Sequence, residues 1–247
     1  MRLIELEPAD ALWALAAEEA VLEAADAGAA GPAWLLWTAP ARCAVLGTAR
    51  PVQADLFAER LAADGVPFWR RRSGGGTVLL GPESPAVARV ERLAAPGRGS
   101  IRESYASFAE VLLAALGRLG LQARFEPPAD LACDGRKLAG LAQRRKRWAV
   151  LVGASVLAEP NAEDSARYLR EPVPGDAPAY RAGRTHGAFM TSRAELGLAD
   201  PAARFRQALR LELIRRGAAE GPLLPEERRR AGEIARELAR PEWRRRF

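Results

Sequence analysis

Lysine is rare in this chain, and one of its two lysines stands in a glycine-flanked segment. Of 37 basic residues only Lys137 and Lys146 are not arginine, and Lys137 lies in the run Gly135-Arg-Lys-Leu-Ala-Gly140. An ammonium is a compact point charge on a flexible stem, which a planar guanidinium does not replace. We therefore expect that this position requires an ammonium group.

A second segment combines guanidinium groups with three consecutive glycines. Residues 70–76 read Arg-Arg-Arg-Ser-Gly-Gly-Gly. Glycines allow a ligand to approach the backbone closely, and successive N–H groups form a concave anion site. Arginine side chains can hold phosphate or carboxylate through two parallel hydrogen bonds. The segment has neither the Gly-Lys-Ser/Thr ending of a Walker loop nor the dinucleotide spacing, and alone it also fits a basic turn between strands.

Composition narrows the class of protein. With 247 residues, 49% of them hydrophobic, the chain can bury a full core. No apolar run approaches the roughly 20 residues of a membrane span, and acidic residues interrupt the start, so we expect a cytoplasmic protein. The net charge is +6, but 31 acidic residues are mixed among the basic ones, which argues against nucleic acid as the main partner. The two cysteines form no metal-ligand or disulfide pattern.

The elements that must position these segments can be read from periodicity and turn signals. Ser100 and Glu103 form a capping box before a helix that Gly120 ends. Asp134-Gly135 is a hairpin turn, and residues 130–134 alternate as a half-buried strand does. We expect strands 33–37 and 43–46 to pair through a turn at Pro40. The remaining predicted helices cover 8–26, 56–63, 201–216 and 225–240, and the remaining strands 67–70, 77–80 and 147–157. Strands and helices do not alternate regularly, which favours an α+β fold with one main sheet.

The two glycine-containing segments, taken together and in this order, resemble lipoate–protein ligases and the wider family of biotin/lipoate ligases and octanoyltransferases. That family shows Arg-Arg-x-Ser-Gly-Gly-Gly followed by Gly-(Arg/Lys)-Lys-hydrophobic-(Ala/Ser)-Gly-x-Ala-Gln-Arg, which stand here at residues 70–76 and 135–144. Weaker similarities occur at residues 15–22, 44–47, 180–191 and 237–244, so the resemblance spans about residues 10–247.

The resemblance implies a mixed sheet backed by helices, as in class II aminoacyl-tRNA synthetases and biotin ligases. Residues 1–213 would form the catalytic domain and residues 214–247 a basic helical extension packed on it. It also implies that lipoate and ATP give lipoyl-AMP, from which the acyl group passes to a lysine of an acceptor lipoyl domain of the 2-oxoacid dehydrogenase or glycine-cleavage H type. Mg²⁺ is expected with ATP, without assigned protein ligands. The small accessory domain of some ligases is missing, which points to a separate partner chain or to no adenylation.

By the same resemblance Lys137 is the catalytic residue, bridging the acyl carbonyl and the phosphate. His186 and Cys133 are further candidates, and no residue is expected to bind a metal ion. The residues expected to bind the acyl-adenylate are Arg70, Arg71, Ser73, Gly74, Gly75, Gly76, Gly140, Gln143, Arg144 and Gly153.

Two departures from the family pattern keep other functions open. A His-Asp pair is missing after the glycine triplet, and Val152-Gly153-Ala154 stands where many members have His-Gly-Thr/Ser. The alternatives are an octanoyl or lipoyl transferase that uses a cysteine thioester and a non-catalytic acyl- or nucleotide-binding protein. Cys43 and Cys133 are both expected in the core, and Cys133 is the only candidate nucleophile. Lipoate, octanoate and biotin are not distinguished.

Overall fold

The main sheet has eight strands in the order β11-β1-β2-β6-β10-β9-β8-β7. The computed structural model describes residues 1–82, 84–157, 162–173, 175–199 and 201–247. Strands β1 and β11 run parallel to β2, and from β2 to β7 every neighbouring pair is antiparallel. The strands are β1 Arg2–Glu5, β2 Ala33–Thr38, β6 Pro85–Arg92, β7 Ala123–Glu126, β8 Asp130–Cys133, β9 Arg136–Arg145, β10 Ala149–Val156 and β11 Ala219–Glu220.

A second sheet of three strands, β4-β3-β5, lies beside the first. It contains β3 Cys43–Leu46, β4 Phe68–Arg70 and β5 Val78–Leu80. Strands β2 and β3 were expected to pair, and this prediction was wrong. Both edges of β2 are occupied by β1 and β6, so β3 pairs instead with β4 and β5.

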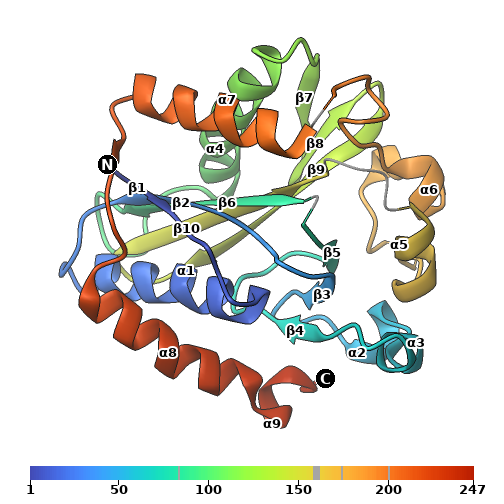
Figure 1. Cartoon of the computed structure of the whole chain (residues 1–247), viewed down its shortest axis with the longest axis horizontal. Helices are drawn as coiled ribbons and strands as arrows, with labels where there is room; N and C mark the ends of the chain where they lie inside the picture. The colour runs from blue at the N-terminus through green and yellow to red at the C-terminus, as the bar shows by residue number, and fades with distance from the viewer. Residues whose placement is uncertain (83, 158–161, 174, 200) are drawn as a thin grey trace.

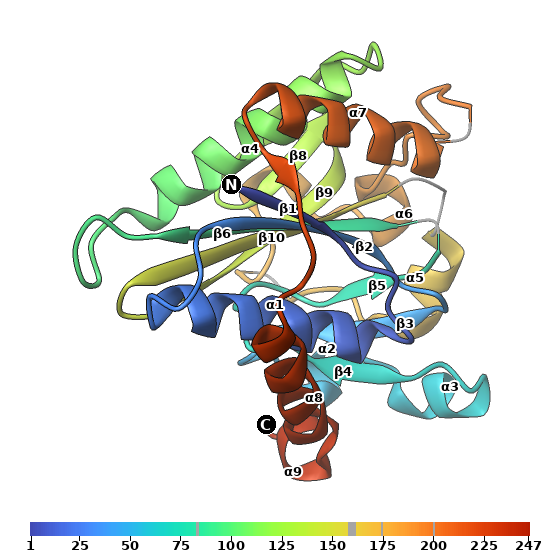
Figure 2. The same ribbon diagram turned by 60° about the vertical axis from the view of Figure 1, so that its left-hand side comes forward.

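Helices cover both faces of the main sheet (Figure 1). Helices α4 (Ile101–Gly117) and α7 (Pro201–Arg215) lie on one face, and α1 (Ala11–Asp26) lies on the other. Helix α8 (Pro225–Ala239) packs on the outer side of α1 and leads to α9 (Pro241–Arg244), as Figure 2 also shows. The short helices α2 (Val52–Asp55), α3 (Ala58–Ala63), α5 (Ala162–Tyr168) and α6 (His186–Phe189) lie near the small sheet and the end of β9.

Capping residues in the sequence explain where helices α1 and α4 begin. The Asp10 carboxylate accepts a hydrogen bond from the Trp13 backbone at 2.7 Å and caps α1. The predicted capping box of Ser100 and Glu103 is present at the start of α4. Helix α1 is rich in alanine and buried on most sides, because the sheet covers one face and α8 the other.

The lysine segment is itself a long strand, β9, which was not predicted. The Asp134-Gly135 turn before it is confirmed: both residues have positive φ, as a two-residue hairpin turn requires. Strand β8 is buried along its whole length rather than on alternate residues, so Asp130 does not face solvent. No helix in the described part of the chain is both long and apolar enough to cross a lipid bilayer.

Candidate active site

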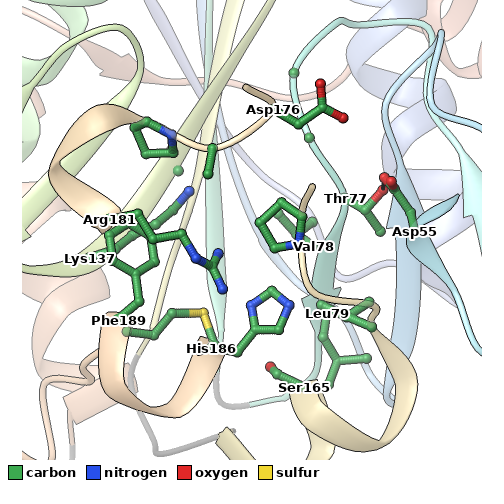
Figure 3. A pocket seen from close by; sticks show the side chains of 18 of the residues that line it. Asp55, Thr77, Val78, Leu79, Lys137, Ser165, Asp176, Arg181, His186 and Phe189 are labelled. Atoms are coloured by element: carbon green, nitrogen blue, oxygen red, sulfur yellow. Dashed lines mark hydrogen bonds between the residues drawn. The ribbon is translucent and has the colours of Figure 1, made fainter. Parts of the chain in front are cut away.

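Two adjoining cavities open between the sheets, α1 and the segment before α6. The first, called here the apolar cavity, has a volume of about 410 Å³ and reaches Leu15, Glu18, Trp37, Val45, Leu80, Ala86 and Leu151. The second, the polar cavity of about 380 Å³, reaches Arg50, Asp55, Thr77, Ser165, Arg170, Arg181 and His186 and is seen in Figure 3. Both are lined by Gly75, Gly76, Lys137, Gly140, Ser155 and Asp176, so the two cavities meet at Lys137.

The floor of the apolar cavity is a row of mostly small residues across the main sheet. In the strand register Gly140 lies opposite Ser155, Ser155 opposite Ala86, and Ala86 opposite Trp37. Neighbouring strands are about 4.8 Å apart, so this row spans roughly 14 Å from Gly140 to Trp37. Small side chains leave space above the sheet where larger ones would fill it. The cavity therefore exists because β6, β9 and β10 carry small residues along this row.

The Lys137 ammonium is held by a carboxylate from the neighbouring strand. Its Nζ lies 2.7 Å from Oδ1 of Asp130. The other oxygen, Oδ2, accepts a hydrogen bond from the Tyr180 hydroxyl at 2.9 Å. Burial and the adjacent carboxylate raise the pKa of Tyr180, so it stays a donor at neutral pH.

Gly140 makes room for the lysine side chain. A Cβ added at Gly140 would lie 3.1 Å from Nζ and 3.2 Å from Cε of Lys137. The stem of Lys137 thus crosses the backbone of its own strand at the one position without a side chain. This path brings the ammonium to the junction of the two cavities.

The loop that contains Gly74, Gly75 and Gly76, called here the glycine loop, is held in its conformation by Arg71. The Arg71 guanidinium donates to the carbonyl oxygens of Gly74 at 2.6 Å and Gly76 at 2.8 Å. Burial lowers the pKa of Arg71 to about 10, which leaves it charged at neutral pH. Gly75 has a φ of +86°, and a Cβ there would lie 3.0 Å from Arg71 Nη2. The loop therefore requires glycine at this position for its own conformation.

Gly47, at the end of β3, supports the same loop. A Cβ at Gly47 would lie only 2.0 Å from the carbonyl oxygen of Gly75. On the other side, the Gly74 N–H donates to the Gln143 carbonyl at 3.0 Å. The loop is thus held between β3 and β9, the strand that carries Lys137.

Most of the predicted binding residues lie at the cavities, and four do not. Arg71, Ser73, Gly75, Gly76, Lys137, Gly140, Gly153 and His186 line one or both cavities. Arg70, Gly74, Gln143 and Arg144 line neither.

The side chains of three of these residues are engaged elsewhere. Arg70 donates to the carbonyls of Gly47 and Arg50 at 3.0 and 2.6 Å, and Arg144 pairs with Glu19 at 2.8 Å. Gln143 donates to the Ile101 carbonyl at 3.2 Å. The positions of these side chains indicate a framework role rather than direct ligand contact.

His186 lines the polar cavity, and its Nε2 lies 3.6 Å from a carboxylate oxygen of Glu171. Its Nε2 lies 3.1 Å from the Arg170 carbonyl oxygen, and burial lowers the pKa of the imidazole. Arg181 lies over the Phe189 ring at 4.8 Å and pairs with Glu171. These contacts fix the segment 180–189 along one wall of the cavity.

Neither cysteine lines the apolar or the polar cavity. Cys133 donates its thiol to the Gln122 carbonyl at 3.4 Å, and burial raises its pKa. A raised pKa lowers the fraction of thiolate, which is the nucleophilic form. Cys43 is 2% exposed within β3.

Asp130, Tyr180 and Glu18 are among the residues of the site that were not predicted. Asp130 and Tyr180 come together only through the tertiary fold, and Glu18 sits on a helix whose two faces are both covered. Within the described residues no group of three or more His, Cys, Asp or Glu could hold a metal ion.

Comparisons with known proteins agree with this geometry. The profile of the lipoyl protein ligase A/B catalytic domain matches residues 10–209. The octanoyltransferase LipM of Kyrpidia tusciae is 28% identical over 268 aligned positions, which cover 98% of this chain and 97% of that protein.

Two solved structures share the fold. The bi-partite lipoate protein ligase of Thermoplasma acidophilum, studied with its E2 lipoyl domain, has a TM-score of 0.84 at 18% identity, covering 99% of this chain and 95% of that one. A lipoate-protein ligase A bound with ATP also has a TM-score of 0.84, at 19% identity over 98% of this chain and 97% of that one. The predicted fold class is confirmed. With the profile matching most of its length, the chain belongs to the lipoyl protein ligase A/B catalytic domain family.

Proposed function

We propose that this chain is a lipoate–protein ligase that activates lipoate with ATP. The observation that carries the proposal is the position of Lys137, whose ammonium lies where the apolar cavity meets the polar cavity. An acyl chain in the first cavity and a nucleotide in the second would bring carboxylate and α-phosphate together at this charge.

The polar cavity suits an anionic nucleotide. Among its lining side chains the cations are Arg50, Lys137, Arg170 and Arg181, and the anions are Asp55 and Asp176. The excess of positive charge favours a triphosphate. The glycine loop adds backbone N–H groups on the same wall. Mg²⁺ would enter with the phosphates, since this ion is usually bound through substrate phosphates and one or two carboxylates rather than by an all-protein site.

The reaction would proceed in two displacements. A carboxylate oxygen of lipoate forms a bond to the α-phosphorus while the bond to the pyrophosphate oxygen breaks, giving lipoyl-AMP and pyrophosphate. The ε-amine of an acceptor lysine then attacks the acyl carbonyl carbon, AMP leaves with the bridging oxygen, and the amine loses a proton. Lys137 would stabilise the oxygen charge in both steps. Asp130 and Tyr180 would keep its ammonium in place.

An acceptor lipoyl domain is the proposed partner. The Thermoplasma ligase of the same fold was studied with its E2 lipoyl domain. We extend that class of acceptor to this chain, of either the 2-oxoacid dehydrogenase or the glycine-cleavage H type. Because the Thermoplasma ligase of the same fold is bi-partite, a separate accessory chain is part of the proposal.

The second candidate function is octanoyl transfer between carrier domains. The 28% identity to an octanoyltransferase over nearly the full length of both proteins favours it. The positions of the cysteines favour the ligase, because neither thiol lines a cavity. A thioester route would require Cys133 to leave its buried position.

A double variant, Cys43→Ser with Cys133→Ala, separates these two functions. We expect it to lipoylate an acceptor domain from lipoate and ATP at a rate close to that of the unmodified protein. The measurement is intact mass of the acceptor, with octanoyl-loaded carrier protein as the competing donor. Loss of all transfer, together with an acyl adduct on Cys133 of the unmodified protein, would identify a transferase instead.

A further inference from the structure

Glu18 places an ionisable carboxyl inside the apolar cavity, next to side chains that would contact the tail of an acyl chain. It comes from α1 and lines the cavity together with Leu15, Trp37 and Leu80. These three neighbours are at most 8% exposed, whereas Glu18 itself is half-buried. The cavity holds a carboxyl where apolar surface would be expected.

Only one oxygen of this carboxyl is satisfied within the described residues. The Trp37 indole N–H donates to Oε1 of Glu18 at 2.7 Å. No hydrogen bond to Oε2 is formed by the described part of the protein. When an acyl chain displaces water from Glu18, an ionised carboxylate with one unpaired oxygen has a large desolvation free energy. The desolvation free energy of a neutral carboxylic acid is much smaller.

The charged groups around Glu18 do not compensate for burial. Arg71, beyond β4, favours the ionised form, but its guanidinium is bonded to the carbonyls of Gly74 and Gly76. Glu19, the next residue on α1, opposes ionisation. Lys137, Asp130 and Asp176 line the other part of the cavity. Burial is the largest effect and raises the pKa of Glu18 to about 7, with the Trp37 hydrogen bond acting in the opposite direction.

The length of the floor indicates that an acyl tail reaches Glu18. From Gly140 to Trp37 the row of residues spans roughly 14 Å. An extended eight-carbon chain is about 9 Å long, given C–C bonds of about 1.5 Å. A chain whose carboxylate lies at Lys137 therefore extends over about two strand spacings, to Ala86, and its end lies next to Trp37, the residue opposite Ala86 and the partner of Glu18.

We propose that Glu18 is a specificity-determining residue at the buried end of the acyl cavity, and that a medium-length acyl tail binds there only when the Glu18 carboxyl carries a proton. The inference rests on the proposed function in one respect, that the apolar cavity holds the acyl chain. Acyl binding then becomes pH-dependent in the neutral range, and each chain bound above that range takes up a proton.

The test is calorimetric titration with octanoate between pH 6 and pH 9. For the unmodified protein we expect a constant affinity at the acid end and a fall of about tenfold per pH unit above pH 7, as single-proton linkage requires. Butanoate has the same carboxylate but is too short to reach Glu18, so its affinity should not show this fall. Glu18→Gln keeps an acceptor for the Trp37 N–H and should bind octanoate equally at all these pH values.

Glu23→Gln is the matched control. Glu23 lies on the same helix, bonds Arg230 at 2.7 Å and lines neither cavity, so this variant should keep the pH-dependent fall. Parallel profiles in the unmodified protein and Glu18→Gln would overturn the proposal.

A second measurement needs no variant. Titrations at pH 8 in two buffers of different ionisation enthalpy report the protons taken up, and we expect close to one proton per octanoate. Zero uptake would overturn the proposal. The titrations contain no ATP, so a failure of ligase activity would not alter these outcomes, and octanoate that fails to bind at any pH would refute the acyl cavity itself.

Discussion

At the scale of single residues, the site depends on how one lysine side chain is held. The Lys137 ammonium is fixed by Asp130 at 2.7 Å, and Asp130 in turn by the Tyr180 hydroxyl at 2.9 Å. The stem crosses Gly140, where there is no side chain to displace it. The position of the Lys137 ammonium therefore depends on Asp130, Tyr180 and Gly140, which would not themselves contact the reacting atoms.

Gly140→Ala should reduce acyl activation without unfolding the protein. The new Cβ would lie 3.1 Å from Nζ of Lys137, so the flexible stem must move and carry the ammonium away from its position. A misplacement of about 1 Å can cost on the order of 10²-fold in rate. The measurement is pyrophosphate release with lipoate and ATP. Gly31→Ala is the control, because a Cβ there meets nothing within 4 Å and Gly31 lines neither cavity, and equal rates for both variants would contradict the account.

Glu18→Gln should stabilise the protein at alkaline but not at acid pH. Because burial raises the pKa of Glu18 from 4.5 to about 7, the native state prefers the protonated form. The contribution of Glu18 to stability is therefore fully present below pH 4.5 and is lost as the pH rises towards 7. Each pKa unit corresponds to about 1.4 kcal/mol, so the variant should gain up to about 3 kcal/mol by pH 8. Urea unfolding at pH 5 and pH 8 measures the difference.

Glu23→Gln should show the opposite sign. Burial acts to raise the pKa of Glu23, but the hydrogen bond from Arg230 and the charges of Lys146 and Arg72 outweigh it and lower the pKa. Its ionised form therefore stabilises the native protein above pH 4.5. The variant should be less stable than the unmodified protein at pH 8, with the difference shrinking as the pH falls below 4.5.

At the scale of elements, the glycine loop connects the two sheets through backbone contacts. Gly47 at the end of β3 contacts the Gly75 carbonyl, and the Gly74 N–H bonds to β9 at Gln143. From the other side, the Trp243 indole N–H after α8 donates to the Arg70 carbonyl at 2.9 Å. Arg70 and Arg71 donate to backbone carbonyls at this contact between the sheets, whereas Arg72 pairs with Glu23 of α1 and Glu237 of α8. Of the three, only Arg71 lines a described cavity, so the sequence pattern suggested more ligand contact than the positions show.

Gly47→Ala should disrupt the contact between β3 and the glycine loop. A Cβ 2.0 Å from a backbone oxygen forces β3 and the loop apart, and overpacking of this kind typically costs on the order of 2 kcal/mol. We expect a lower melting temperature together with weaker lipoate binding. Gly31→Ala is the control, since a Cβ there meets nothing within 4 Å. A Gly47→Ala protein with unchanged melting temperature and affinity would show that the loop is not held in this way.

Local signals predicted many of the elements but not how they pair. The capping box of α4 and the Asp134-Gly135 turn each depend on neighbouring residues only, and both are present. The predicted pairing of β2 with β3 was wrong because β1 and β6 occupy both edges of β2. Such competition between distant segments leaves no signal in a local pattern.

At the scale of the whole molecule, the site is made where strands from distant parts of the chain come together. Lys137 and the glycine loop were predicted because short motifs contain them. Asp130 and Tyr180 are fifty residues apart and meet only in the folded protein. Glu18 could not be assigned to the cavity, because the covering of α1 by both the sheet and α8 removes the usual contrast between a polar and an apolar helix face.

The central claim is that the Lys137 ammonium promotes transfer of the adenylyl group of ATP to the carboxylate of lipoate. The most direct measurement is a single-turnover reaction with lipoate and ATP, followed by quantification of lipoyl-AMP and pyrophosphate. The unmodified protein should form both. Lys137→Ala should be slower by on the order of 10²–10³-fold, and Lys137→Arg should fail to restore the rate, because a planar head does not replace a point charge.

Lys146→Ala removes the other lysine, which lies 3.5 Å from Glu23 and lines neither cavity, and should react at the unmodified rate. Formation of lipoyl-AMP by Lys137→Ala at that same rate would contradict the account.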